Sequence, residues 1–200
     1  MPSARGIASG AERPPMSVGL LGMQSLIGAA VVLGVALFYI VAVPVINGLV
    51  KGQNPFEVGQ PYIAFDSYQF TPQEGWDLVS SNDLFVTLGK EGSNVVFTEL
   101  VSADQTPEEA ILTAIDALAQ DQANSWVIGG PTAFVTNDGD HGVSATSHST
   151  TQATQIWVIT DGTSNLTVFA SSPESVWVSL NDEIVTMVQS IVFLSEEESQ

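Results

Sequence analysis

Cysteine is absent from the 200-residue chain, and lysine and arginine together number only four. Without cysteine the chain can form no disulfide, no thiolate metal site and no cysteine nucleophile, and it has no cysteine to carry a lipid anchor. An exported domain without disulfides differs from the small secreted modules of eukaryotes. This composition fits a bacterial exterior better.

The few basic residues are unevenly placed. They are Arg5, Arg13, Lys51 and Lys90, whereas only Glu12 of the 22 acidic residues precedes Lys51. The chain after Lys51 therefore sets one lysine against nearly all of the carboxylates. Such a surface repels nucleic acid, which needs a basic footprint, and it also repels anionic lipid headgroups. It fits cationic partners, divalent ions or solubility in a salty exterior, and a solvated acidic surface is the simplest interpretation.

One long stretch has no charge at all. No acidic or basic residue occurs between Arg13 and Lys51, and Val18–Val43 is almost entirely apolar. A bilayer core is about 30 Å thick and needs about 20 apolar helical residues. The sequence therefore predicts one transmembrane helix over 18–46. This run is longer than the apolar region of a signal peptide, so we expect it to remain as an anchor.

The flanking charges predict the orientation of this single-pass protein in the cell membrane. Arg5, Arg13 and the terminal amine precede the span, and Lys51 alone follows it closely. Cytoplasmic flanks carry the excess of basic residues. We therefore expect residues 1–17 to be a disordered cytoplasmic tail and the C-terminal domain to be extracytoplasmic.

Small residues lie on two faces of the predicted span and allow close helix packing in lipid. This predicts that the span packs against other membrane protein subunits. An equally weighted interpretation is that glycine and alanine are simply common in membrane helices. The predicted packing positions are Gly22, Ser25, Ala29, Ala30, Gly34 and Ala36.

The rest of the chain is long enough for one compact domain, which we place at 62–194, between a stalk at 47–61 and an acidic tail at 195–200. Apolar patterning and hairpin turns predict a mainly antiparallel sheet. The expected strands are 62–70, 84–88, 95–101, 126–135 with a bend at 129–131, 142–150, 155–160, 166–170 and 191–193.

Two soluble helices are expected. Thr106, Pro107 and Glu109 form a capping box that opens the first helix, and Ser172 is a candidate N-cap for the second. Because 155–160 is apolar on both faces, we expect helices on both sides of the sheet. The fold class is therefore α+β, a mainly antiparallel sheet flanked by helices, preceded by one transmembrane helix. The apolar stripe expected on the second helix is Trp177, Leu180, Ile184, Met187 and Ile191.

Three motifs in this order resemble a known family. They are Pro72-Gln-Glu-Gly-Trp76, Asn181-Asp-Glu-Ile184 and the run from Met187 to Phe193. The pattern resembles the PsbP-like α/β/α sandwich superfamily, including its membrane-anchored and lipid-anchored actinobacterial members. The resemblance implies a non-catalytic accessory or assembly subunit of a membrane complex, with an actinobacterial respiratory supercomplex as a candidate host. It carries over no active-site residue.

The sequence shows no clear catalytic or metal-binding set. His141 and His148 have an odd separation along one strand, which sends them to opposite faces. Asn137–His141 lacks the ligand spacing of a calcium loop, so a hairpin turn is expected there. No carboxylate stands in an apolar neighbourhood that would raise its pKa. We therefore expect no catalytic, cofactor-binding or metal-ligating residue and no enzyme activity.

Two alternatives remain open. The Ser- and Thr-rich strand at 142–150 and the acidic surface also fit a membrane-tethered binding module for a cell-envelope lipid, sugar or cation. A hydrolase that uses paired carboxylates is the other alternative. The tryptophans at 76, 126, 157 and 177 are most simply core residues rather than a sugar-stacking platform.

Overall fold

The computed structural model describes residues 59–119 and 126–194. The predicted tail at 1–17, the span at 18–46 with its packing positions, most of the stalk and the tail at 195–200 lie outside the described residues. Within the described part of the chain, no helix is long and apolar enough to cross a membrane.

Two antiparallel sheets make up the domain. The larger has the order β3-β4-β5-β11-β10-β9-β7, with β6 beside β11 and β8 beside β9, and the smaller has the order β1-β2-β12. The strands of the larger sheet are β3 (Asp77–Ser81), β4 (Phe85–Lys90), β5 (Ser93–Thr98), β6 (Val101–Ser102), β7 (Val127–Ile128), β8 (Thr132–Val135), β9 (His141–His148), β10 (Gln152–Thr160) and β11 (Ser164–Pro173). Those of the smaller sheet are β1 (Tyr62–Ala64), β2 (Tyr68–Phe70) and β12 (Val192–Phe193).

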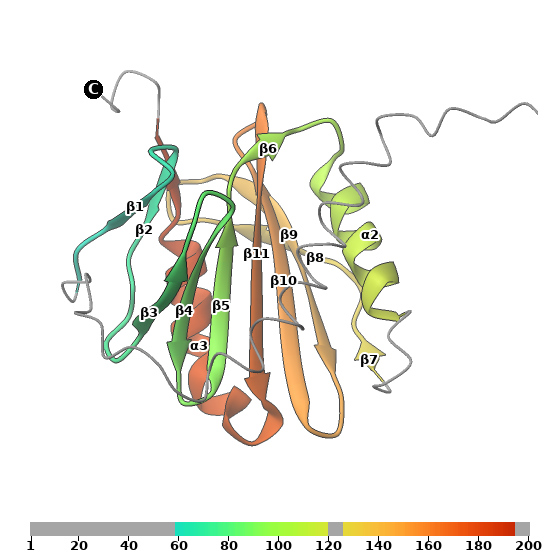
Figure 1. Cartoon of the computed structure of the whole chain (residues 1–200). Helices are drawn as coiled ribbons and strands as arrows, with labels where there is room; N and C mark the ends of the chain where they lie inside the picture. The colour runs from blue at the N-terminus through green and yellow to red at the C-terminus, as the bar shows by residue number, and fades with distance from the viewer. Residues whose placement is uncertain (1–58, 120–125, 195–200) are drawn as a thin grey trace, which may run out of the picture.

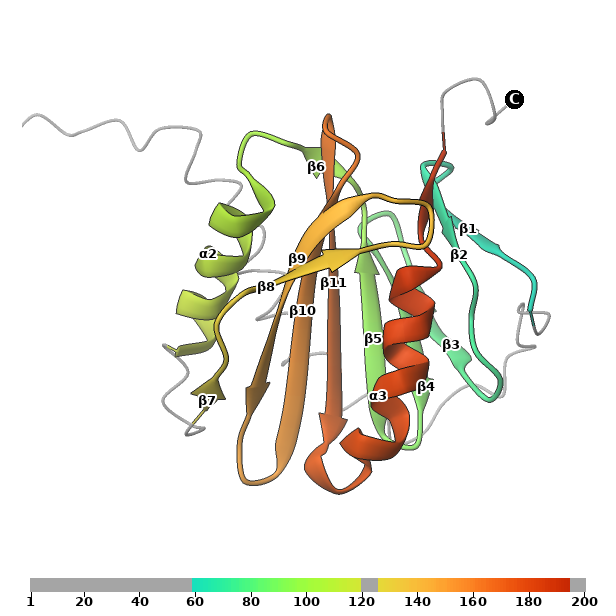
Figure 2. The same cartoon turned by 180° about the vertical axis from the view of Figure 1, so that it is seen from behind.

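One helix lies on each face of the larger sheet, as predicted. Figures 1 and 2 show α2 (Pro107–Ala119) on one face and α3 (Glu174–Gln189) on the other. The central strand β10 faces both layers, because Trp157 and Ile159 join the core under α3, whereas Ile156 and Val158 join the core under α2. The double-sided apolar pattern of 155–160 therefore identified the middle of the sandwich.

The larger core lies between α3 and the sheet. The helix buries Trp177, Leu180, Ile184 and Met187, and Ile191 just beyond its end is also buried, which confirms the predicted stripe. Such a stripe arises because residues three and four apart share one face of a helix.

The start of α2 is as predicted, but the start of α3 is not. The Thr106 backbone N–H donates to Glu109 Oε2 at 3.1 Å, and the Glu109 N–H donates to Thr106 Oγ1 at 3.3 Å, which completes the capping box. The prediction of Ser172 as N-cap is wrong, because Pro173 holds that position without a side-chain cap. Strand β11 continues through Ser172, whose hydroxyl instead pairs with that of Ser93 at 2.7 Å.

Three strand predictions need correction. The single strand at 62–70 is wrong, since Phe65 (φ 56°) and Asp66 (φ 54°) make a tight turn between β1 and β2. Such turns need positive φ and usually contain glycine or asparagine, so this one gave no sequence signal. The strand at 95–101 is broken between β5 and β6, and β3 was missed because four of its five residues are exposed and do not alternate.

The bend predicted at 129–131 is confirmed. Ile128 pairs with Ser147 and Thr132 pairs with Ser144. The three residues 129–131 between β7 and β8 therefore lie opposite only two residues of β9, 145 and 146. The Gly129 N–H still donates to the Thr146 carbonyl oxygen at 2.8 Å. A Cβ on Gly129 would lie only 3.0 Å from that oxygen, so a bulge built on glycine fits here.

Candidate functional site

Lys90 is the only lysine or arginine between residues 59 and 194, and its side chain forms hydrogen bonds within the domain. Its Nζ donates to Glu183 Oε2 at 2.7 Å and to the Glu74 carbonyl oxygen at 2.9 Å. Trp76 Nε1 donates to the same Glu183 oxygen at 2.9 Å. The contact therefore joins the Gly-Trp turn, the end of β4 and the middle of α3.

The carboxylate at the centre of this contact has a shifted pKa. Burial raises the pKa of Glu183, but the hydrogen bonds from Lys90 and Trp76 and the lysine charge outweigh it, so the pKa lies below its ordinary value. Two motifs that carry the family resemblance, Pro72–Trp76 and Asn181–Ile184, are thus in direct contact. Sequence reasoning noted both motifs without predicting that they meet.

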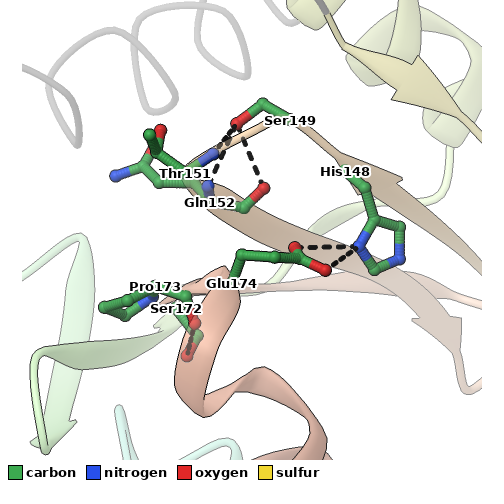
Figure 3. Close-up of polar contacts among 7 residues, drawn as sticks. All are labelled: His148, Ser149, Thr151, Gln152, Ser172, Pro173 and Glu174. Carbon is green, nitrogen blue, oxygen red and sulfur yellow. Dashed lines mark hydrogen bonds and ion pairs between the residues drawn. The ribbon is translucent and has the colours of Figure 1, made fainter.

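A second polar cluster lies at the N-terminal end of α3 (Figure 3). His148 Nδ1 lies 3.1 Å and 3.3 Å from the two carboxylate oxygens of Glu174. The Trp177 ring meets the imidazole edge-on, with centroids 6.3 Å apart. Both partners of the pair are somewhat more than two-fifths exposed, so this imidazole is oriented but open to solvent.

The turn between β9 and β10 positions this pair. Ser149 Oγ accepts the Gln152 N–H at 3.0 Å and the Thr151 N–H at 3.3 Å (Figure 3). The Thr151 carbonyl oxygen in turn accepts the Glu174 N–H at 3.0 Å. Because the turn binds the first residue of α3, the Glu174 carboxylate is placed beside the end of β9.

The His148–Glu174 pair is oriented like the histidine and carboxylate of a catalytic triad. In a hydrolase triad a hydroxyl lies at the imidazole nitrogen that the carboxylate leaves free. The nearby hydroxyls in the described residues bond elsewhere, Ser149 to the Gln152 carbonyl oxygen and Ser172 to the Ser93 hydroxyl. The arrangement can hold the imidazole in one tautomer and connect two elements.

The structure places the remaining candidate residues apart. His141 and His148 lie at the two ends of β9 and, by strand alternation, on opposite faces. Within the described residues, no group of three or more His, Asp or Glu side chains could hold a metal ion. Ser144 and Ser147 of the polar strand are buried, and Ser144 Oγ lies 3.1 Å from Thr132 Oγ1.

One expectation about carboxylates is wrong. Partial burial, followed by the neighbouring charge of Asp138, raises the pKa of Asp140 above its ordinary value. The residue closes the hairpin turn predicted at 137–140, where its N–H donates to Thr136 Oγ1 at 3.0 Å. The Asn137 N–H also donates to the Gln189 carbonyl oxygen at 2.8 Å, so this turn is fastened to the end of α3. The turn explains the burial, which the sequence did not reveal.

The tryptophans are mainly core residues, as expected. Trp76, Trp157 and Trp177 are buried, and the side chain of Trp126 is partly buried. They therefore form no exposed stacking platform.

Comparison with known proteins identifies the fold. No family model and no curated protein matches the sequence. The solution structure of cyanobacterial PsbP (CyanoP) from Synechocystis sp. PCC 6803 matches with a TM-score of 0.50 at 17% identity, over 74% of this chain and 99% of that chain. A point mutant of protein Mog1 matches with a TM-score of 0.50 at 8% identity, over 70% of this chain and 98% of that chain.

A third solved structure is that of LpqN, involved in cell envelope biogenesis of Mycobacterium tuberculosis. It matches with a TM-score of 0.48 at 10% identity, over 78% of this chain and 97% of that chain. At such identities, the cyanobacterial PsbP and Mog1 matches establish architecture rather than activity. The chain has the PsbP-like α/β fold that its sequence motifs predicted.

Proposed function

We propose that the protein is a non-catalytic accessory or assembly subunit of a membrane protein complex, held by one span with its domain outside the cytoplasm. The observation that carries the proposal is the almost entirely negative charge of the domain. Its single lysine is bound by Glu183 and by the Glu74 carbonyl oxygen, so the remaining charged side chains are carboxylates apart from its two histidines. Complementary charge steers association and selects partners, so a partner with a basic exterior surface fits best.

The fold supports this role by analogy. The PsbP-like superfamily, which the motifs resemble, includes accessory subunits of photosystems, and one matching structure is itself a PsbP. Fold-level analogy supports a class of role without naming its partner. An actinobacterial respiratory supercomplex is the host that we propose on this analogy.

The predicted span supplies the second contact in this proposal. Its small-residue faces, which include Ala30 and Gly34, would pack against a helix of the host complex. Span and domain together would then set the position of the subunit, with neither contact having to be strong alone.

Co-purification from native membranes tests the proposal. Tagged full-length protein, extracted in a mild detergent, should bring down a defined set of membrane subunits, and Gly34→Leu should reduce their yield because it blocks close helix approach. The matched control is Val35→Leu, where a larger apolar side chain already stands. Recovery of the chain alone, or equal yields from both variants, would count against the proposal.

A tethered binding module for a cell-envelope lipid, sugar or cation is the second candidate. Thr154 Oγ1 and Asn165 Oδ1 are buried and have no hydrogen-bond partner among the described residues. A buried polar atom without a protein partner can bind water or a small ligand. The two candidates are distinguished by the melting temperature of the purified protein with and without calcium or cell-envelope lipid. A specific ligand raises the melting temperature as its concentration exceeds the dissociation constant. No shift with either probe would leave the accessory role as the better account.

A further inference from the structure

The edge of the large sheet formed by β8 has backbone groups that no described strand pairs. Within the described residues, β8 pairs only with β9. The Thr136 N–H at the end of β8 donates to the Asp140 carbonyl oxygen at 3.0 Å, so the Thr136 backbone is turned toward β9. Hydrogen-bonding direction alternates from residue to residue along a strand, so the N–H and C=O groups of Ala133 and Val135 point away from β9.

This edge lacks the features that usually prevent another strand from adding to a sheet. Natural edge strands are protected by charged side chains, by bulges or by a covering element. No acidic or basic residue occurs between Asp121 and Asp138, and Ala133 and Val135 are both exposed, Val135 to 46%. The bend at 129–131 precedes β8 and leaves its own pairing regular. The opposite edge strand, β3, has both an acidic residue and a register shift.

We propose that residues 132–135, which we call the docking edge, bind an extended segment of a partner subunit that adds to the sheet as a strand beside β8. In strand addition, main-chain hydrogen bonds supply affinity and side chains at alternate positions supply specificity. The segment would belong to the host assembly, so the docking edge rests on the proposed function and gives it a location on the domain.

The side chains of the docking edge define the sequence that fits it. Ala133 and Val135 share one face of β8, because side chains alternate along a strand. Side chains of neighbouring strands contact each other on a common face. A partner segment with apolar residues at alternate positions would therefore cover these two exposed side chains.

Charge defines one end of the partner segment. Asp138 and Asp140 lie in the turn that follows the docking edge. After partial burial, the charge of Asp138 is the next cause of the raised pKa of Asp140, so the two carboxylates repel each other. A lysine or arginine at this end of the segment would offset the repulsion. A second copy of the chain fits less well, because each copy has a formal net charge of −18 and like charges repel.

Two substitutions in the docking edge and one matched control test the proposal. Ala133→Pro removes an outward N–H without removing a bond to β9, and Val135→Lys places a charge in the contact. Val178→Lys makes the same change in net charge on α3, at a position 86% exposed. With tagged full-length protein from native membranes, the edge variants should lower the yield of co-purified subunits about tenfold, and the control should change it less than about twofold.

Hydrogen exchange gives a second readout that needs no substitution. Backbone amides of 132–136 should exchange about tenfold or more slowly in the co-purified assembly than in the isolated full-length protein, because the added strand protects the outward N–H groups. Amides of α2 should exchange equally in both samples. This measurement decides the matter if a lowered melting temperature shows that Ala133→Pro unfolds the domain.

The possible results separate the docking edge from the proposed function. If the wild-type chain brings down no subunit, the proposed function fails and the docking edge fails with it. If the wild-type chain and all three variants bring down the same subunits equally, only the docking edge is wrong. Unchanged exchange at 132–136 in the assembly contradicts it independently. Protection that is already present in the concentrated isolated protein and disappears on dilution would assign the edge to a second copy of the chain instead.

Discussion

Glu183 connects parts of the chain that are distant in sequence. One of its oxygens accepts hydrogen bonds from both Trp76 Nε1 and Lys90 Nζ, and about a third of the side chain remains exposed. Hydrogen bonds to a charged group are stronger than neutral ones, although exposure reduces their net value. At the residue scale, this contact ties α3 to the β3–β4 hairpin.

We predict that Glu183→Gln destabilises the domain by about 1 kcal/mol, because the amide keeps the shape but loses the charge that Lys90 pairs with. Urea unfolding measures the change. The matched control is Asp182→Asn, one residue away in the same helix, which should alter stability by less than about 0.5 kcal/mol. Equal losses in the two variants would mean that net charge, not this contact, sets the effect.

The pH dependence has a definite sign. The pKa of Glu183 is lowered in the folded state, so its contribution is present above the unfolded value, near 4.5, and is lost as pH falls through the folded value. The same holds for Asp161. Burial raises its pKa, but the hydrogen bonds from Thr163 and Ser164 lower the pKa by more, so it lies below its ordinary value. Asp140 acts oppositely, because its raised pKa favours folding as pH falls.

Unfolding free energy measured from about pH 6 down to about pH 3 checks this account. The wild-type value should fall below about pH 4.5 with a steeper slope than in Glu183→Gln, because the variant has lost one group that takes up a proton on unfolding. Parallel slopes for the two proteins would show that the lowered pKa of Glu183 does not contribute to folding.

At the element scale, the capping box of α2 gives the clearest test. Thr106→Ala removes the hydroxyl that accepts the Glu109 N–H, so we expect a loss of about 1 kcal/mol. Thr113→Ala lies inside the same helix, where alanine is the better helix former, and should be neutral or slightly stabilising. Thermal unfolding of both variants compares them. A loss at Thr113 as large as that at Thr106 would contradict the capping explanation.

The elements also show what the sequence could and could not predict. The helix stripe, the capping box and the two-faced strand β10 were predictable because each is a local pattern of residues. The β1–β2 turn was not, since Phe65 and Asp66 take positive φ without the usual glycine. The His148–Glu174 pair was not predictable either, because its partners meet only through the pairing of β10 with β9 and β11.

At the scale of the whole molecule, the main feature is the large negative net charge. The chain carries a formal net charge of −18, and the domain's one lysine is held by Glu183. If a basic surface recognises the domain, raising the ionic strength should weaken their association, because salt screens exposed charges over about 8 Å at physiological strength. Yields of co-purified subunits at low and high salt measure this effect. Salt-independent yields would indicate that the span alone makes the contact.

We propose that the chain is a subunit of a larger membrane assembly. Native electrophoresis of membranes from the source organism after gentle detergent extraction, with the chain detected by antibody, tests this proposal. Most of the chain should migrate with a complex many times its own mass of 21.1 kDa and should move to lower mass in harsher detergent. Migration as a lone monomer under the gentlest conditions that keep other membrane complexes intact would contradict it.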